Sequence, residues 1–136
     1  MLELPPLSLY IHIPWCVKKC PYCDFNSHEA QSDIPESDYI DILCQDFDRD
    51  YEHCDARSLQ SIFIGGGTPS LFGAKSFEKI LTHIRSKASL SGECEITLEA
   101  NPGTAEADKF SGYFAAGINR LSIGVQRFDE RQLKNL

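Results

Sequence analysis

Basic residues are scarce in this sequence. Its 136 residues include 13 Lys and Arg against 20 Asp and Glu, so the formal net charge is -7. Binding to nucleic acid through a general basic surface depends on cations that displace the counterions of phosphate groups. The charge balance therefore argues against a nucleic-acid partner.

The sequence also has no long hydrophobic run and no visible leader peptide. Its apolar runs are a few residues long, whereas a transmembrane helix needs about 20 residues. The opening MLELPP has one acid and no basic residue, which excludes the pattern of a secretory signal or an Arg-rich transit peptide. We expect a cytoplasmic protein without a transmembrane segment.

Cysteine is too sparse for a disulfide scaffold. Six cysteines occur in 136 residues, which is below the roughly 8–10% found in small secreted domains of that kind. Cys16, Cys20 and Cys23 fall within eight residues, whereas the other three are scattered singly. Cys44 and Cys94 lie on the apolar sides of a predicted helix and a predicted strand, so we expect them in the core.

Four short apolar segments alternate with helical patterns. This order is typical of strand–helix units that form a parallel sheet. The first helix is expected to begin at Pro35, and the third is expected to have Thr104 as its N-cap and Gly117 as its C-cap. A fourth helix is expected to start near Asp129. The expected strands span residues 7–13, 61–64, 94–100 and 121–126.

Apolar and polar residues alternate along most of these segments. Strands covered by helices on both faces read as continuous apolar runs, so the alternation predicts helices on one face and a polar lining on the other. This pattern favours an α/β fold that is the amino-terminal part, about four strand–helix units, of a partial TIM-type barrel. In such barrels chemistry occurs at the carboxyl ends of the strands, where the cysteine loop, the glycine run 65–67, Glu99 and Gln126 all fall.

The cysteine loop offers three thiolates at close spacing. Three cysteines can hold three corners of a 4Fe-4S cluster, and without a fourth cysteine nearby one iron stays open for chemistry. Two plainer interpretations remain at this point. One is a zinc site in which His12 or His28 joins the cysteines, and the other is a set of thiols without a ligand.

Cys-x3-Cys-x2-Cys after a first strand resembles the hallmark of the radical S-adenosylmethionine superfamily. Four segments of the chain further resemble successive motifs of the oxygen-independent coproporphyrinogen III oxidase family, and from the first to the last they span residues 9 to 126. These segments are Leu9-Tyr-Ile-His-Ile-Pro-Trp-Cys16, Phe63-Ile-Gly-Gly-Gly-Thr-Pro-Ser70, Leu98-Glu-Ala-Asn-Pro102 and Leu121-Ser-Ile-Gly-Val-Gln126.

The resemblance implies that Cys16, Cys20 and Cys23 bind a 4Fe-4S cluster beside S-adenosylmethionine. Without the resemblance, several residues of the site have a plainer interpretation. A triple glycine is most often a turn, Glu99 is a solvated acid, Gln126 is a surface residue, and Tyr10 is an aromatic that fills the barrel. The residues that the resemblance assigns to S-adenosylmethionine are Tyr10, Tyr22, Gly66, Gly67, Thr68, Glu99 and Gln126.

Two features separate this chain from the decarboxylases of the family. Phe25 stands where they have a further cysteine, and only six residues precede the first strand. Both features are similar to the haem chaperone branch, which implies a protein that binds haem and passes it to an acceptor protein. Arg127 is a departure, because relatives usually have a small or acidic residue after the glutamine.

Two functions therefore remain. The first is a haem chaperone with an iron-sulfur cluster, S-adenosylmethionine and haem as ligands, and with an acceptor protein and a reductant as partners. The alternative is an oxygen-independent coproporphyrinogen III oxidase, a radical enzyme of porphyrin biosynthesis that takes porphyrinogen as substrate. In either case we expect residues 1–136 to be an incomplete radical SAM core domain, with the remaining barrel, a carboxyl-terminal domain and the haem-binding residues outside this sequence.

Overall fold

A four-stranded parallel sheet organises the chain in the computed structural model, which describes residues 3–31, 33–102 and 104–133. The strand order across the sheet is β1-β4-β5-β6, so each strand pairs with its successor through a helical crossover. None of the helices in the described ranges combines the length and apolar character that a bilayer crossing requires. The four strands are β1 (Leu7–Ile13), β4 (Leu59–Gly66), β5 (Leu90–Ala100) and β6 (Arg120–Ile123).

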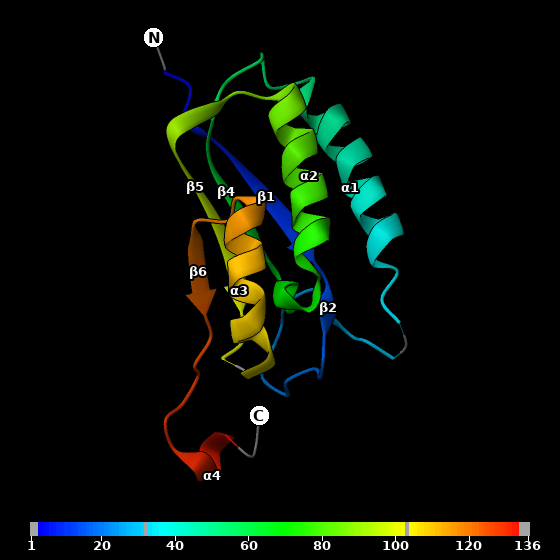
Figure 1. The fold of residues 1–136 in the computed structure, drawn as a ribbon, viewed down its shortest axis with the longest axis vertical. Helices are drawn as coiled ribbons and strands as arrows, with labels where there is room; N and C mark the ends of the chain where they lie inside the picture. The colour runs from blue at the N-terminus through cyan, green and yellow to red at the C-terminus, as the bar shows by residue number, and fades with distance from the viewer. Residues whose placement is uncertain (1–2, 32, 103, 134–136) are drawn as a thin grey trace.

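The three long helices lie side by side on one face of the sheet (Figure 1). Their bounds are α1 (Glu36–Tyr51), α2 (Ala74–Lys87) and α3 (Thr104–Ala116). The carboxyl ends of the strands point to the lower end of Figure 1, where the cysteine loop also lies. The shorter elements are β2 (Trp15–Cys16), β3 (His28–Glu29), a 3-10 helix (Pro69–Leu71) and α4 (Glu130–Leu133).

The covered face of the sheet carries the hydrophobic core. Successive residues of a strand point to opposite faces, and the odd-numbered residues of β1 and the even-numbered residues 62–64 of β4 and 94–98 of β5 pack in the core. The predicted coverage of one face only is therefore confirmed. Core side chains with 6% exposure or less include Ile11, Ile13, Ile62, Ile64, Ile96, Leu98, Ile40, Phe77, Ile80, Leu81 and Ile84.

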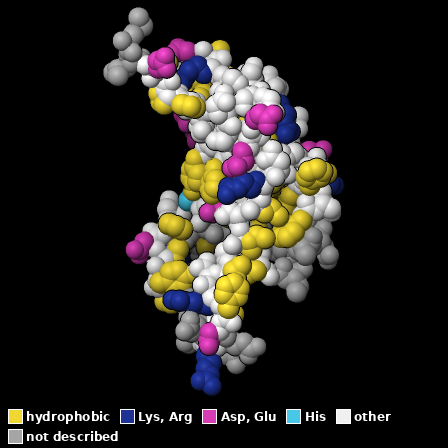
Figure 2. Space-filling view, turned by 90° about the vertical axis from the view of Figure 1, so that its left-hand side faces the viewer, with side chains coloured by type: hydrophobic (Ala, Val, Ile, Leu, Met, Phe, Trp, Pro, Cys, Tyr) yellow, Lys and Arg dark blue, Asp and Glu magenta, His cyan; other side chains and the backbone are white. Residues whose placement is uncertain are grey.

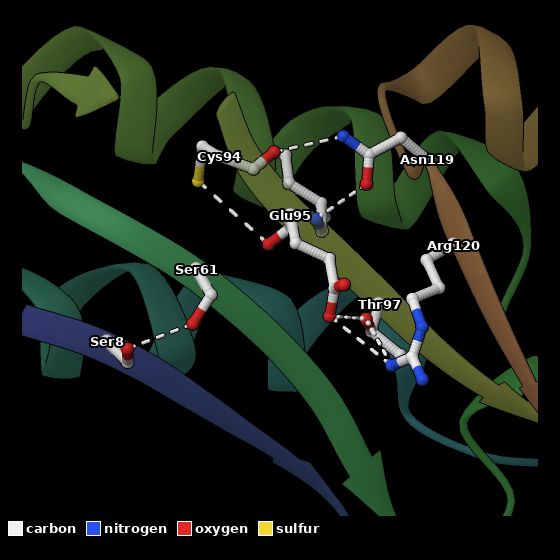
Figure 3. Close-up of polar contacts among 8 residues, drawn as sticks. Ser8, Ser61, Cys94, Glu95, Thr97, Asn119 and Arg120 are labelled. Carbon is white, nitrogen blue, oxygen red and sulfur yellow. Dashed lines mark hydrogen bonds and ion pairs between the residues drawn. The ribbon is translucent and has the colours of Figure 1, made fainter. Parts of the chain in front are cut away.

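The open face of the sheet is polar and aromatic. Tyr10 of β1 stacks on Phe63 of β4 with ring centroids 6.3 Å apart, and Phe63 lies in register with Thr97 of β5. Arg120 of β6 donates to the Thr97 hydroxyl and to the Glu95 carboxylate, each at 3.3 Å (Figure 3). These polar contacts join β6 to β5 on the open face, while Leu121 of β6 packs against the core.

Asn119 extends the junction between these two strands. Its side-chain amide donates to the carbonyl of Cys94 at 2.9 Å, and its side-chain oxygen accepts from the amide of Ile96 at 2.7 Å (Figure 3). The side chain thus makes the pair of hydrogen bonds that a further strand residue would make. β6 is consequently held by the residue that precedes it as well as along its length.

The second predicted strand is wrong at its end. β4 continues through Gly65 and Gly66, which pair with His12 and Ile13 of β1. Glycine ends a strand by preference, not by necessity, and here the absence of side chains lets the two backbones and the His12 ring pack closely. The glycine run therefore belongs to the sheet as well as to the loop that follows.

The predicted bounds of the last two strands also need correction. β5 begins at Leu90, four residues before Cys94, and β6 ends at Ile123 although the apolar alternation continues to Gln126. Gln126 has φ +63°, a left-handed conformation that a strand does not contain. Residues 124–126 therefore belong to a loop and not to β6.

The predicted helix ends agree with the structure in two of three places. α1 starts after Pro35, and Gly117 ends α3 with φ +108°. The amide of Gly117 donates to Phe114 O and that of Ile118 donates to Tyr113 O, which is a Schellman motif. Thr104 is the first helical residue and not the N-cap, because α3 includes it; the position before it lies outside the described residues.

Candidate functional site

A cavity of about 520 Å³ lies at the carboxyl ends of β4, β5 and β6. The cysteine loop and the segments that follow the three strands form its walls. Nine of the ten predicted site residues line it, the exception being Tyr10. The side chains and backbone groups at this cavity belong to Cys16, Val17, Lys18, Cys20, Tyr22, Cys23, Phe25, Gly66, Gly67, Thr68, Pro69, Glu99, Ala100, Asn101, Ser122, Gly124 and Gln126.

The cysteine loop is closed at its base by backbone pairing. β2 and β3 pair in parallel, and the amides of His28 and Ala30 donate to Pro14 O at 2.7 Å and Cys16 O at 2.9 Å. Inside the loop, the amide of Cys23 donates to Cys20 O at 3.1 Å. The three thiols are therefore carried by a short loop with fixed ends.

The glycine run (residues 65–67) and Thr68 hydrogen-bond to the backbone at the start of the cysteine loop. The amide of Gly67 donates to Ile13 O at 2.8 Å, and the amide of Thr68 donates to Trp15 O at 2.7 Å. A Cβ atom on Gly67 would come within 2.5 Å of Trp15 O and 2.9 Å of Cys16 Sγ. Only glycine allows this approach, so the run and the loop form one rigid assembly.

Glu99 joins β5 to the glycine run. Its Oε2 atom accepts a hydrogen bond from the amide of Gly66 at 3.2 Å, and Gly66 adopts φ +122° to present that amide. A carboxylate has more acceptor capacity than one amide uses. Glu99 can therefore accept from a hydroxyl or ammonium group of a ligand in the cavity.

Tyr10 lies beside the main cavity and not in it. It lines a neighbouring cavity of about 150 Å³ that shares Gly66, Glu99 and Phe25 with the first. Its phenol lies 2.9 Å from His12 Nδ1, and His12 Nε2 lies 2.7 Å from Asn26 O. Because a carbonyl only accepts, His12 Nε2 donates to Asn26 O, and Nδ1 lies within hydrogen-bond distance of the Tyr10 phenol.

Two tyrosines at the site keep their phenol protons. Burial and the nearby Glu99 carboxylate raise the pKa of Tyr10. Desolvation, together with the Cys20 thiol, raises the pKa of Tyr22. Both side chains are therefore hydrogen-bond donors at neutral pH.

Gln126 reaches the cavity from a turn. The amide of Arg127 donates to Val125 O at 2.7 Å, which closes a three-residue turn around the left-handed Gln126. Gly124 lies under its side chain, since a Cβ atom there would come within 2.9 Å of Gln126 Nε2. Arg127 itself is exposed and does not line the cavity.

Two uncharged polar residues of the cavity were missed by sequence reasoning. Asn101 donates from Nδ2 to the Thr68 hydroxyl at 3.4 Å and so links the end of β5 to the glycine run. Ser122 lies in register with Glu99 on the open face. The signal was available, because Asn101 follows a predicted strand directly and Ser122 shares the predicted polar face with Gln126.

The three thiols do not surround a single point. Among the residues that the structure describes, no three His, Cys, Asp or Glu side chains are grouped closely enough to hold one metal ion. A zinc ion needs four ligands that converge at about 2.0–2.3 Å, and both ring nitrogens of His12 are already engaged. In a 4Fe-4S cluster each thiolate binds a different iron, so cysteines spread around one wall of a cavity fit the cluster better than they fit zinc.

The chain is similar to proteins of one family along nearly its whole length. A family model described as the radical SAM superfamily matches residues 10–136. The "Heme chaperone HemW" of Escherichia coli is 54% identical over 136 residues, and that of Haemophilus influenzae is 57% identical over 140 residues. Each match covers 100% of this chain but 36% and 37% of the relative, respectively, so the chain spans about a third of their length.

A solved structure supports the fold. Coproporphyrinogen III oxidase (HemN) from Escherichia coli, a radical SAM enzyme, superimposes with a TM-score of 0.80 at 30% sequence identity. The match covers 96% of this chain and 31% of that enzyme. The predicted fold class is therefore confirmed: the parallel sheet and its helices correspond to the amino-terminal part of a radical SAM barrel.

Proposed function

Because the chain belongs to the radical SAM superfamily, we propose that its cavity binds a 4Fe-4S cluster and S-adenosylmethionine. The observation that carries this proposal is the convergence of nine predicted site residues, from four separate segments, on one cavity. Its volume of about 520 Å³ is within the range of about 300–1,000 Å³ typical of small-molecule sites. When bound, the pair supplies reductive radical chemistry, which no side chain of this chain can provide.

The residues divide the work by their chemistry. Cys16, Cys20 and Cys23 would hold the cluster, with S-adenosylmethionine beside it. Gly66 and Gly67 bring backbone groups to the ligand without a side chain in between. Thr68, Glu99 and Gln126 supply polar contacts, and Tyr22 donates from its phenol. Tyr10 lines the neighbouring cavity, which shares Gly66 and Glu99 with the main one, so it would contact the ligand only from that side.

We further propose that the complete protein is a haem chaperone. The heme chaperones to which this chain is similar are 54% and 57% identical to it, whereas the decarboxylase of known structure is 30% identical. Phe25, at the cavity wall where the decarboxylases of the family have a further cysteine, supports the same assignment. Haem and an acceptor protein are then its ligand and partner, with a reductant for the cluster, and the cytoplasm is its place.

The second candidate is an oxygen-independent coproporphyrinogen III oxidase. The TM-score of 0.80 against such an enzyme favours it, because the two share the fold around the cavity. The fold is also shared by proteins with other activities. This candidate function would therefore have to be established by measured decarboxylation of coproporphyrinogen III.

The complete protein, purified without oxygen and reconstituted with iron and sulfide, separates the two functions. We expect tight haem binding, visible as a shift of the haem absorbance, and no decarboxylation of coproporphyrinogen III with S-adenosylmethionine and reductant. Sustained formation of protoporphyrinogen, detected by the fluorescence of its oxidised form, would establish the decarboxylase instead. The matched control is the Phe25→Cys variant, which introduces the further cysteine of the decarboxylases. Its haem binding is measured in the same way.

A further inference from the structure

Lys19 occupies the interior of the cysteine loop, unlike its neighbour. Its ammonium donates three hydrogen bonds, to Phe25 O at 2.6 Å, to Ser27 Oγ at 2.8 Å and to Ser27 O at 3.2 Å. An ammonium has three donors, so all are used within the loop. Lys18 is exposed and makes no hydrogen bond or ion pair with the described part of the chain.

These contacts connect the two ends of the arc that carries the second and third cysteines. Lys19 directly precedes Cys20, and Ser27 follows Cys23 by four residues. The Ser27 side chain is 7% exposed, and a buried hydroxyl stabilises the fold only when it is hydrogen-bonded. The Lys19 ammonium thus closes the arc and fixes the position of the Ser27 hydroxyl.

The Ser27 hydroxyl has one proton to donate and two acceptors within reach. One is Phe25 O at 3.4 Å, and the other is Cys23 Sγ at 4.0 Å. Phe25 O already accepts the short bond from Lys19. A thiolate ligand keeps part of its negative charge, and hydrogen bonds to charged acceptors are stronger than neutral ones. The proton therefore goes to Cys23 once that residue is a ligand.

We propose that Lys19 and Ser27 are positioning residues for the cluster: Lys19 holds the cysteine loop closed and orients Ser27, whose hydroxyl donates to the Cys23 thiolate. This inference depends on the proposed function, because it assumes that Cys23 binds iron. Hydrogen bonds to cluster sulfurs stabilise the reduced, more negative state and raise the reduction potential. Ser27 then sets the potential, and Lys19 sets how firmly the cluster is held.

Lys19 is tested by the rate at which the complete, reconstituted protein loses its cluster to a chelator. We expect Lys19→Gln to lose iron about tenfold faster than the wild type, the lower end of the effects of outer ligand partners. Lys87→Gln removes the same charge at an exposed position outside the cavity and should lose iron at nearly the wild-type rate. Equal rates for the two variants would overturn the role of Lys19.

Ser27 is tested by the reduction potential, measured by titration monitored with electron paramagnetic resonance. We expect Ser27→Ala to keep its iron content but to shift the potential to more negative values, while Ser27→Thr keeps the hydroxyl and a potential near that of the wild type. A wild-type potential in Ser27→Ala would overturn the role of Ser27. A purely structural role of this residue would not shift the potential of a cluster that keeps its iron.

The two proposals fail in different ways. If the wild-type protein assembles no 4Fe-4S cluster, the proposed function is wrong. If the wild type assembles the cluster and the variants match their controls, only the inference about Lys19 and Ser27 is wrong. A Lys19→Gln protein that assembles no cluster leaves the decision to the Ser27 pair, which changes no charge.

Discussion

The two faces of the sheet are built from alternate residues of the same strands, yet they have opposite properties. On the face under α1 and α2, Ile64 and Leu98 are fully buried among aliphatic side chains. On the open face, their neighbours Phe63 and Glu99 contact aromatic or polar groups. The period of two in a strand thus separates stability from ligand binding within a single stretch of sequence.

The open side also differs from the core in what it exposes. Figure 2 views the molecule from the side of β6 and shows hydrophobic side chains gathered over its lower half, near the carboxyl ends of the strands. The exposed apolar residues that contribute to this end of the molecule include Val17, Tyr22, Phe25, Ile123, Val125 and Phe128. The cavity is therefore bordered by apolar side chains that are not buried in the core.

The largest effect is expected when a thiol of the loop is compared with a thiol of the core. Cys20→Ala in the complete protein should abolish the cluster, because one corner loses its ligand. Cys44→Ala should retain the full iron and sulfide content, since Cys44 is 8% exposed in the core between α1 and α2. Iron and sulfide analysis measures both, and full iron content in Cys20→Ala would contradict the assignment.

The next effect concerns neighbours on opposite faces of β5. Leu98→Ala should lower the free energy of unfolding of the complete protein by roughly 2–5 kcal/mol, because it opens a cavity in the core. Glu99→Ala should lower it by about 1 kcal/mol, since it removes one hydrogen bond. Binding of S-adenosylmethionine should weaken only in Glu99→Ala. Denaturant unfolding and calorimetric titration check the pair, and equal stability losses would remove the distinction between the faces.

Two glycines sharpen the comparison at the backbone. Gly67→Ala places a methyl group 2.5 Å from Trp15 O, so we expect a loss of roughly 1–3 kcal/mol in stability together with weaker cofactor binding. Gly92→Ala is the control, because nothing lies within 4 Å of its added Cβ atom. Thermal unfolding and titration with S-adenosylmethionine measure both variants. A Gly67→Ala protein that behaves like Gly92→Ala would show that the loops are not tightly packed.

The smallest effect is expected at Gln126. Gln126→Ala removes a neutral polar contact worth about 1 kcal/mol, so the dissociation constant for S-adenosylmethionine should rise about fivefold. Arg127→Ala should leave it unchanged, because Arg127 is exposed outside the cavity. The reverse order of effects in calorimetric titration would mean that Arg127 contacts the ligand.

Burial distinguishes the core thiols by reactivity as well. Burial raises the pKa of Cys44 and of Cys94, and the thiolate is the reactive form. Alkylation of either residue in the folded protein should therefore be slow at neutral pH and should accelerate as the pH rises toward the elevated pKa. Mass spectrometry after timed iodoacetamide treatment measures this, and rapid alkylation of Cys44 at pH 7 would contradict its place in the core.

Periodicity was sufficient to predict the covered face but not where strands stop. β1 has the predicted bounds because Leu7 to Ile13 alternate without a glycine. The end of β4 was missed because Gly65 and Gly66 pair with β1, a long-range contact that local sequence does not encode. The end of β6 was missed because the left-handed backbone of Gln126 leaves the alternation of residue types intact.

The site was predictable as far as residue types carry its chemistry. The cysteine spacing and the acid at the end of β5 identified groups that line the cavity. Asn101 and the loop contacts of Lys19 were not identified, because both depend on hydrogen bonds to residues that approach only in the folded chain. The pairing of Lys19 with Ser27 also required knowing which of two adjacent lysines points inward.

The most direct test is the electron paramagnetic resonance spectrum of the reduced complete protein, recorded with and without S-adenosylmethionine. If the cavity at the carboxyl ends of the strands holds a cluster with one open iron, the spectrum is that of a 4Fe-4S centre and changes when S-adenosylmethionine is added. The cluster spectrum itself should be absent in Cys20→Ala, and the change on adding S-adenosylmethionine should weaken in Glu99→Ala. Zinc in place of iron, or a cluster spectrum that S-adenosylmethionine leaves unchanged, would contradict the assignment.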